Sequence, residues 1–125
     1  MMTHLNELVA YMRSLVDDYE RLIDQAKIIR ADHDGERVRL FIAHADRVLD
    51  SSRRILPEAK TVMASGSSDV LVKHISVYYR MIKYVSIRYM VDLLEEALPS
   101  LTGNPGTLAE MQRLLAGFRE LRDTL

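Results

Sequence analysis

Apolar side chains recur at alternating steps of three and four residues along most of this 125-residue chain. That period places them on one face of an α-helix and differs from the two-residue period of a half-buried strand. The pattern stops only where Gly, Pro and small polar residues gather, around residues 32–35, 65–68 and 99–106. The sequence therefore predicts four amphipathic helices, at about residues 3–31, 36–64, 68–97 and 107–124, and no strand.

The connections between these helices are short, which predicts that successive helices lie antiparallel. We expect a single domain over residues 1–125 that is all-α, an up-down-up-down four-helix bundle whose fourth helix is shorter than the others. A chain of this length buries about two-thirds of the surface that its unfolded form exposes, so it needs no covalent cross-link to fold.

Three stretches predict local features at the helix ends. In "ADHDG", a polar turn, Gly35 is expected to cap the first helix. Pro57 interrupts the second helix, where we expect a kink or a fresh helix start. In "TLAE", Thr107 and Glu110 are expected to form a capping box at the start of the fourth helix.

Composition excludes several classes of protein. The chain has no cysteine, which excludes disulfides, thiolate metal sites and cysteine nucleophiles, and a reducing cytoplasm is the expected location. Lys and Arg number 17 against 18 for Asp and Glu, a net charge of -1 that argues against a broad nucleic-acid-binding surface. No apolar run approaches the roughly 20 residues of a membrane span, and no Glu-x-x-His motif of a di-iron bundle is present. We therefore expect no membrane insertion, no metal and no cofactor.

The segment "RLFIAH" carries the only candidate catalytic pair, Arg39 and His44. Its spacing resembles the Arg-x4-His motif of the HEPN-type helical ribonucleases. The resemblance covers six residues and departs from the family at Leu40, where a polar residue is usual. It implies metal-independent RNA cleavage by Arg39 and His44, the enzymatic alternative for this chain.

The third segment contains "VKHISVYYRMIKYVSIRYM" and holds four of the six tyrosines of the chain. At about 100° per residue, one stripe of this helix is expected to face the core. The residues of that stripe are Leu71, Ile75, Tyr78, Ile82, Val85 and Tyr89. A second apolar row, Val77, Tyr84 and Val91, recurs every seven residues on the opposite side, framed by Arg80 and Arg88.

A helix of a monomeric bundle needs only one apolar side, so this second row predicts a partner. Three partners are considered: a second copy of the chain, a different protein, or nucleic acid. The first is favoured, and an antiparallel crossing near Tyr84 would bring Lys73 toward Glu95 of the other copy and Arg80 close to Arg88. The acids Asp92, Glu95 and Glu96 oppose the helix dipole at the end of this segment, and the sequence identifies no partner for them.

The short fourth helix predicts that one end of the core is incompletely covered. We expect a groove there that accepts a partner helix or an apolar ligand. Its expected lining is Leu5, Leu8, Met12, Val62, Met63, Leu71 and Ile75. The favoured function is a non-enzymatic interaction or regulatory module that forms a homodimer through the third helix.

Overall fold

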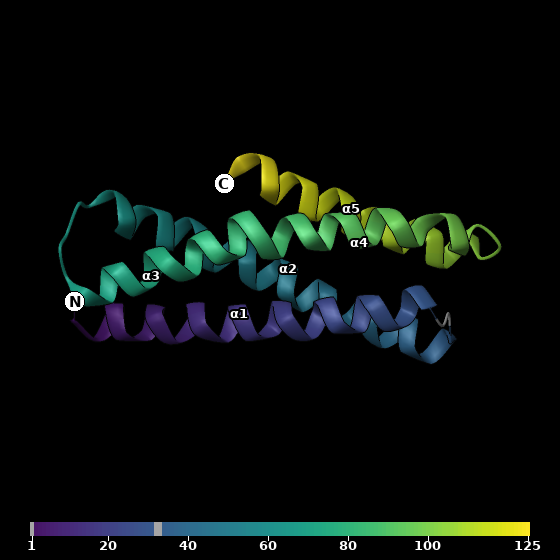
Figure 1. The fold of residues 1–125 in the computed structure, drawn as a ribbon, viewed down its shortest axis with the longest axis horizontal. Coiled ribbons are helices and arrows are strands. Elements are labelled where there is room, and N and C mark those ends of the chain that lie inside the picture. Colours follow the sequence, from purple (N-terminus) through teal and green to yellow (C-terminus); the bar gives the residue numbers. More distant parts are fainter. Residues whose placement is uncertain (1, 32–33) are drawn as a thin grey trace.

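The protein is an all-α helical bundle. The computed structural model describes residues 2–31 and 34–125, and every regular element in those ranges is helical. The elements are α1 (Met2–Ala31), α2 (Gly35–Ala64), α3 (Val70–Met81), the π-helical turn η1 (Ile82–Ser86), α4 (Ile87–Ala97), the 3₁₀ turn η2 (Leu98–Leu101) and α5 (Pro105–Thr124). Figure 1 shows that α3 and α4 form one continuous rod across the molecule, and we call α3, η1 and α4 together the third rod.

The turn between α1 and α2 is built on an acidic cap. Asp34 accepts hydrogen bonds from the backbone N–H groups of Glu36 and Arg37, at 3.0 and 3.2 Å, as N-cap residues do. Gly35 is the first residue of α2, so the prediction that it caps α1 was wrong. Asp32 and His33, the other residues of the expected polar turn, lie outside the described residues.

α2 continues through Pro57 as one helix, so no fresh helix begins there. The Thr61 hydroxyl donates to the Pro57 carbonyl at 3.1 Å. The helix ends at Ala64, and Gly66, two residues later, has a φ of 70°, in the left-handed region that favours glycine.

α3 and α5 also begin at polar caps. Asp69 accepts a hydrogen bond from the Leu71 N–H at 2.8 Å. Asn104 accepts one from the Thr107 N–H at 3.2 Å, and Pro105 occupies the first helical position, where its missing N–H costs nothing. The predicted capping box was therefore wrong, because Asn104 begins this helix before Thr107 is reached.

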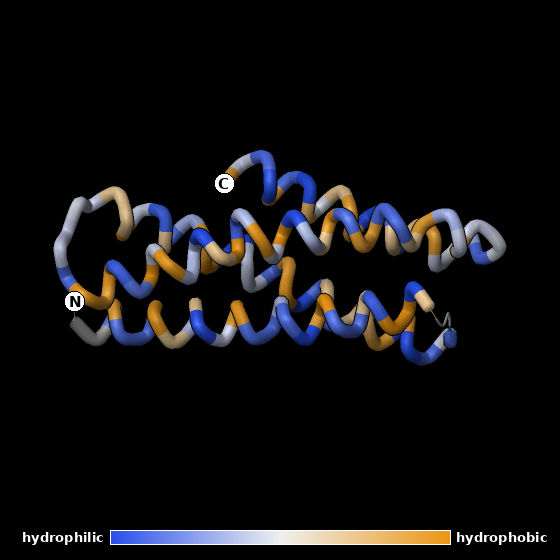
Figure 2. Tube along the Cα trace, viewed as in Figure 1, coloured by the Kyte–Doolittle hydropathy of each residue, from blue (hydrophilic) through white to orange (hydrophobic). Residues whose placement is uncertain are grey.

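Hydrophobic positions recur along every rod, separated by hydrophilic ones (Figure 2), and the buried apolar residues form one core. No helix in the described ranges is long and apolar enough to cross a membrane. Near the middle of the core, the rings of Tyr19 and Phe118 meet edge to face, with centroids 6.2 Å apart.

One polar pair lies inside this core. The Tyr19 hydroxyl and Ser52 Oγ are 2.7 Å apart, and Ser52 Oγ also lies 2.7 Å from the Val48 carbonyl. A carbonyl only accepts, so the single hydroxyl proton of Ser52 goes to Val48 and Tyr19 donates to Ser52. Burial raises the pKa of Tyr19, and the bond to Ser52 offsets a part of that rise.

Candidate interaction surface

The third rod contains a π-helical turn where the sequence pattern predicts continuous α-helix. At η1 the Ile87 N–H donates to the carbonyl of Ile82, five residues earlier, instead of four. Such a turn holds one residue more than an α-helical turn, and π turns inside α-helices often occur at functional sites. The helix therefore changes which residues face the core at this point.

The buried residues follow this change. Ile75 and Tyr79 are buried before the turn, and Ile82 and Ser86 are buried at its two ends. After the turn Ile87, Met90 and Leu94 are buried. The core stripe predicted with a uniform 100° step was therefore wrong beyond Ile82. Its members Val85 and Tyr89 are 60% and 40% exposed.

The predicted second row changes in the same way. Val77 and Tyr84 are exposed as expected, but Val91 is 1% exposed and belongs to the core. Val91 was placed on the wrong side because the extra residue in η1 rotates every later position. Tyr78 is half-buried, and its hydroxyl accepts a hydrogen bond from Arg13 Nε at 3.3 Å.

The exposed apolar surface of the third rod is consequently larger than the sequence predicts. Val77, Met81 and Val85 follow each other at steps of four, with Tyr84 beside them, and all four are exposed. We call these four residues the third-rod face. The sequence carries no clear signal for this face, because Val85 follows Ile82 by three residues and continues the helical spacing of apolar residues.

Tyr84 lies on this face between two cations. Lys83 Nζ is 5.1 Å from the centroid of its ring, and Arg88 Cζ is 5.7 Å away. Both distances are within the range of cation–π attraction. A ring held in this way loses little freedom on contact with a partner, which favours an anchor role. Arg80, the other predicted flanking residue, is exposed.

The end of α5 is attached to the same rod. Lys83 Nζ donates to the Leu125 carbonyl at 2.7 Å, and the Tyr79 hydroxyl donates to it at 3.3 Å. Burial, and then the neighbouring Tyr84, raise the pKa of Tyr79, which keeps its hydroxyl protonated as a donor. The hydrogen bond to Leu125, at the end of α5, thus holds Lys83 over the ring of Tyr84.

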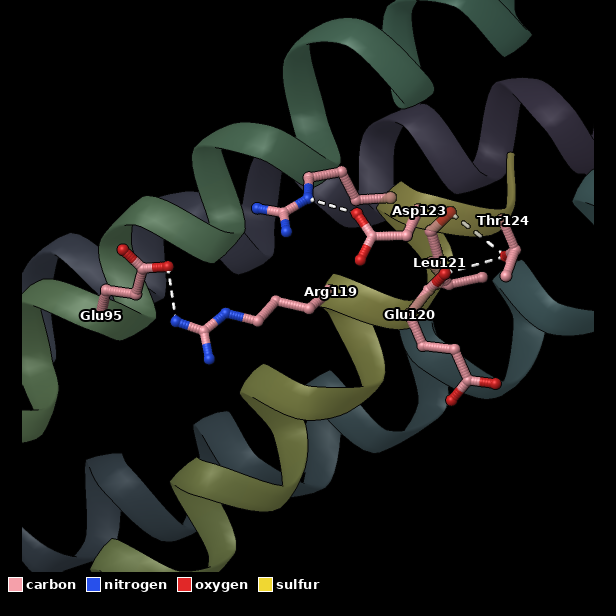
Figure 3. Close-up of polar contacts among 7 residues, drawn as sticks. Glu95, Arg119, Glu120, Leu121, Asp123 and Thr124 are labelled. Carbon is pink, nitrogen blue, oxygen red and sulfur yellow. Dashed lines mark hydrogen bonds and ion pairs between the residues drawn. The ribbon is translucent and has the colours of Figure 1, made fainter.

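The acids at the end of the rod have partners on neighbouring helices. Arg119 of α5 pairs with Glu95 at 2.8 Å (Figure 3), and Arg30 of α1 pairs with Glu96 at 2.5 Å. These arginines offset the unfavourable position of the two carboxylates at a helix C-terminus. Asp92 is exposed and forms no ion pair with the described residues.

Arg39 and His44 have separate environments. The exposed guanidinium of Arg39 bonds both carboxylate oxygens of Glu36, at 2.6 and 2.7 Å, and this bond raises its pKa. His44 is half-buried with Nδ1 2.6 Å from Gln25 Oε1, and burial, followed by the nearby Arg47, lowers its pKa. Each side chain is thus engaged by a different neighbour and not by the other.

The seven residues of the expected groove belong to the hydrophobic core or pack against it. Leu8, Met12 and Ile75 are fully buried, so the prediction that they line an open groove was wrong. The other four, Leu5, Val62, Met63 and Leu71, are half-buried against the core. Contacts among α1, α2 and α3 explain this, because three helices are enough to enclose these side chains.

The described residues contain no cluster of three or more His, Cys, Asp or Glu that could hold a metal ion. Comparison of the chain with models of protein families, with curated proteins and with solved structures finds no match.

Proposed function

We propose that this chain is a non-enzymatic interaction module that self-associates through the third-rod face. One observation carries the proposal. Of nine large hydrophobic residues that are exposed in the described part of the chain, six lie on the third rod. The six are Val70, Val77, Met81, Tyr84, Val85 and Tyr89. Contiguous apolar surface of this kind on a small protein is typical of interaction sites.

A second copy is the favoured partner because the face is complementary to itself. In a two-fold pair, residues equally distant from the axis on either side face each other. An antiparallel pair centred on Met81 sets Val77 against Val85 of the other copy and Met81 against Met81. The row of exposed residues at steps of four therefore contacts the same row of the other copy. Lys73 then lies within one turn of the partner's Asp92, and neither residue has an ion pair with the described residues of its own chain.

Centring the pair on Met81 also avoids two unfavourable contacts of the crossing near Tyr84 that the sequence predicts. A crossing near Tyr84 relies on Glu95, which Arg119 already binds, and sets Arg80 against Arg88. Moving the axis to Met81 separates these two arginines.

The measurement is light scattering after size-exclusion chromatography, at micromolar protein. We expect the parent to be a dimer and Tyr84→Glu to be monomeric, with an affinity at least about tenfold weaker, because the charge is placed in a desolvated contact. Tyr11→Glu is the matched control, since Tyr11 is a tyrosine of similar exposure, 55% against 52%, on α1. A monomeric parent, or equal loss in both variants, would refute the proposal. Circular dichroism of each variant shows whether the fold is retained.

We propose further that the rods alternate in direction, up-down-up-down, with a shorter fourth rod. The support comes from cross-helix contacts in which residue numbers rise on one rod and fall on the next. Between α1 and α2 these pairs are His4 with Glu58, Tyr19 with Ser52 and Gln25 with His44, and between the third rod and α5 they are Lys83 with Leu125 and Glu95 with Arg119. α5 has 20 residues, against 30 for α1 and 30 for α2. Distances between spin labels at the two ends of each rod would test the arrangement.

A further inference from the structure

A pocket of about 560 Å³ lies where α5 ends alongside α2. The helix α5 packs against α2 in this region. The volume is within the range of sites that hold small molecules. The lining residues from α2 are Arg53, Pro57, Lys60, Thr61 and Ala64, and those from α5 are Gly117, Glu120, Leu121, Thr124 and Leu125.

Gly117 lines this pocket from α5, where the two helices approach closely. A Cβ added there would lie 2.5 Å from Leu49 Cδ2 and 3.3 Å from a guanidinium nitrogen of Arg53. Only glycine therefore lets α5 approach α2 this closely, and the guanidinium of Arg53 lies directly against the backbone of α5. Arg53 is exposed, and its guanidinium lies beside this close approach of the two helices.

The interior of the pocket is mainly apolar. Pro57 and Ala64 line it from α2, and Leu121 and Leu125 line it from α5. The hydroxyls of Thr61 and Thr124 donate to carbonyls of their own helices, so they are already satisfied. An aliphatic chain is the molecule that such walls favour.

The charged groups at the pocket differ from the arginines that join helices, because they form no ion pair within the described part of the chain. Arg30, Arg113 and Arg119 each bind a carboxylate of a neighbouring helix. Arg53 and Lys60 have no ion pair with the described residues, and Glu120 is the only acid in the lining. Two cations against one acid favour an anionic head group.

The two cations lie on the same face of α2, seven residues or about 10 Å apart along the axis. Pro57 lies between them in the sequence and lines the same pocket. Partial negative charge at the carboxyl ends of α2 and α5 opposes an anion at the outer end of the pocket, which favours the head group at the Arg53 end. The apolar chain would then run toward Leu121 and Leu125.

We propose that this pocket binds an amphipathic carboxylate, with its head group held by Arg53 and Lys60 and its aliphatic chain between α2 and α5. None of its lining residues belongs to the third-rod face, although Leu125 also accepts the hydrogen bond from Lys83.

The test is titration of the full chain with octanoate, octan-1-ol and inorganic phosphate, followed by NMR shifts of backbone amides. We expect saturable octanoate binding with shifts at Gly117 and Leu121, octanol binding about tenfold weaker, and no saturation with phosphate. Arg53→Gln/Lys60→Gln should reduce octanoate affinity to that of octanol. Arg47→Gln/Arg54→Gln removes the same charge from the same helix outside the pocket and should change little.

Ala64→Phe provides a second variant, because position 64 is exposed and an added ring would occupy the pocket without removing a charge. It should weaken octanoate and octanol alike. Equal binding of octanoate and octanol by the parent would overturn the role of the cations. Phosphate binding as tight as octanoate would indicate a simple anion site, and absence of saturable octanoate binding would overturn the proposal altogether.

Discussion

Replacing Ser52 with alanine removes the acceptor that the described residues provide for the fully buried hydroxyl of Tyr19. Tyr19 is 0% exposed and donates to Ser52 Oγ. A buried donor left without a partner costs about 1–3 kcal/mol, and the better helix propensity of alanine offsets about 0.5 kcal/mol. We expect Ser52→Ala to lower the free energy of unfolding by about 0.5–2.5 kcal/mol.

Tyr19→Phe should cost less, about 0.5–1.5 kcal/mol, because Ser52 still donates to the Val48 carbonyl. In the double variant no donor is left unpaired, so its cost should be close to that of Tyr19→Phe alone. Urea unfolding followed by circular dichroism measures all four proteins of this cycle. Additive costs, within about 0.5 kcal/mol, would refute the assigned direction of the bond.

The same tyrosine predicts an alkaline response. Its pKa is raised in the folded protein, so its stabilising effect is complete below about pH 10, the pKa of an unfolded tyrosine, and declines as the pH rises further. Above pH 10 the free energy of unfolding of the parent should fall more steeply than that of Tyr19→Phe, by up to about 1.4 kcal/mol per pH unit. Identical alkaline unfolding of the two proteins would contradict this expectation.

Two further predictions concern α5. In Gly117→Ala, helix propensity should stabilise the protein by about 1 kcal/mol, but the clash with Leu49 should destabilise it by about 1–3 kcal/mol. Gly106→Ala is the control, because the nearest atom to its added Cβ is 3.8 Å away, and it should be neutral or stabilising. A thermal unfolding experiment that finds Gly117→Ala the more stable variant would count against the close approach of α2 and α5. Arg119→Ala should lower the free energy of unfolding by less than about 1 kcal/mol, because the side chains of Arg119 and Glu95 are 46% and 44% exposed. This decrease should be smaller in 1 M NaCl, which screens the ion pair. A decrease above about 2 kcal/mol in urea unfolding would show that the pair is more than a surface contact.

The helical class of the fold was predictable because the apolar period is maintained over long segments. Residues such as Leu8, Leu15 and Leu22 are buried as their spacing predicts. The helix starts were less predictable, since Asp34 and Asn104 compete with neighbouring residues that are equally suitable as caps. A local pattern does not decide which of several suitable caps the chain uses.

The candidate surface was predicted only in part. Val77 and Tyr84 were placed on it correctly in terms of exposure, but Met81 and Val85 were missed and Val91 was included wrongly. The cause is a single extra residue in the third rod, which a uniform step of 100° does not represent. The partners of Glu95 and Glu96 were not predictable either, because they come from helices that are distant in sequence.

The π-helical turn has a consequence for variation in chain length. The buried residues Ile82 and Ile87 are five apart, so deleting one residue between them would leave a spacing of four, which a plain α-helix satisfies. The core on both sides of η1 would then be retained, and the lost residue would come mainly from the exposed stretch that includes Tyr84 and Val85. Insertions and deletions at this point are therefore expected to remodel the surface of the protein while sparing its interior.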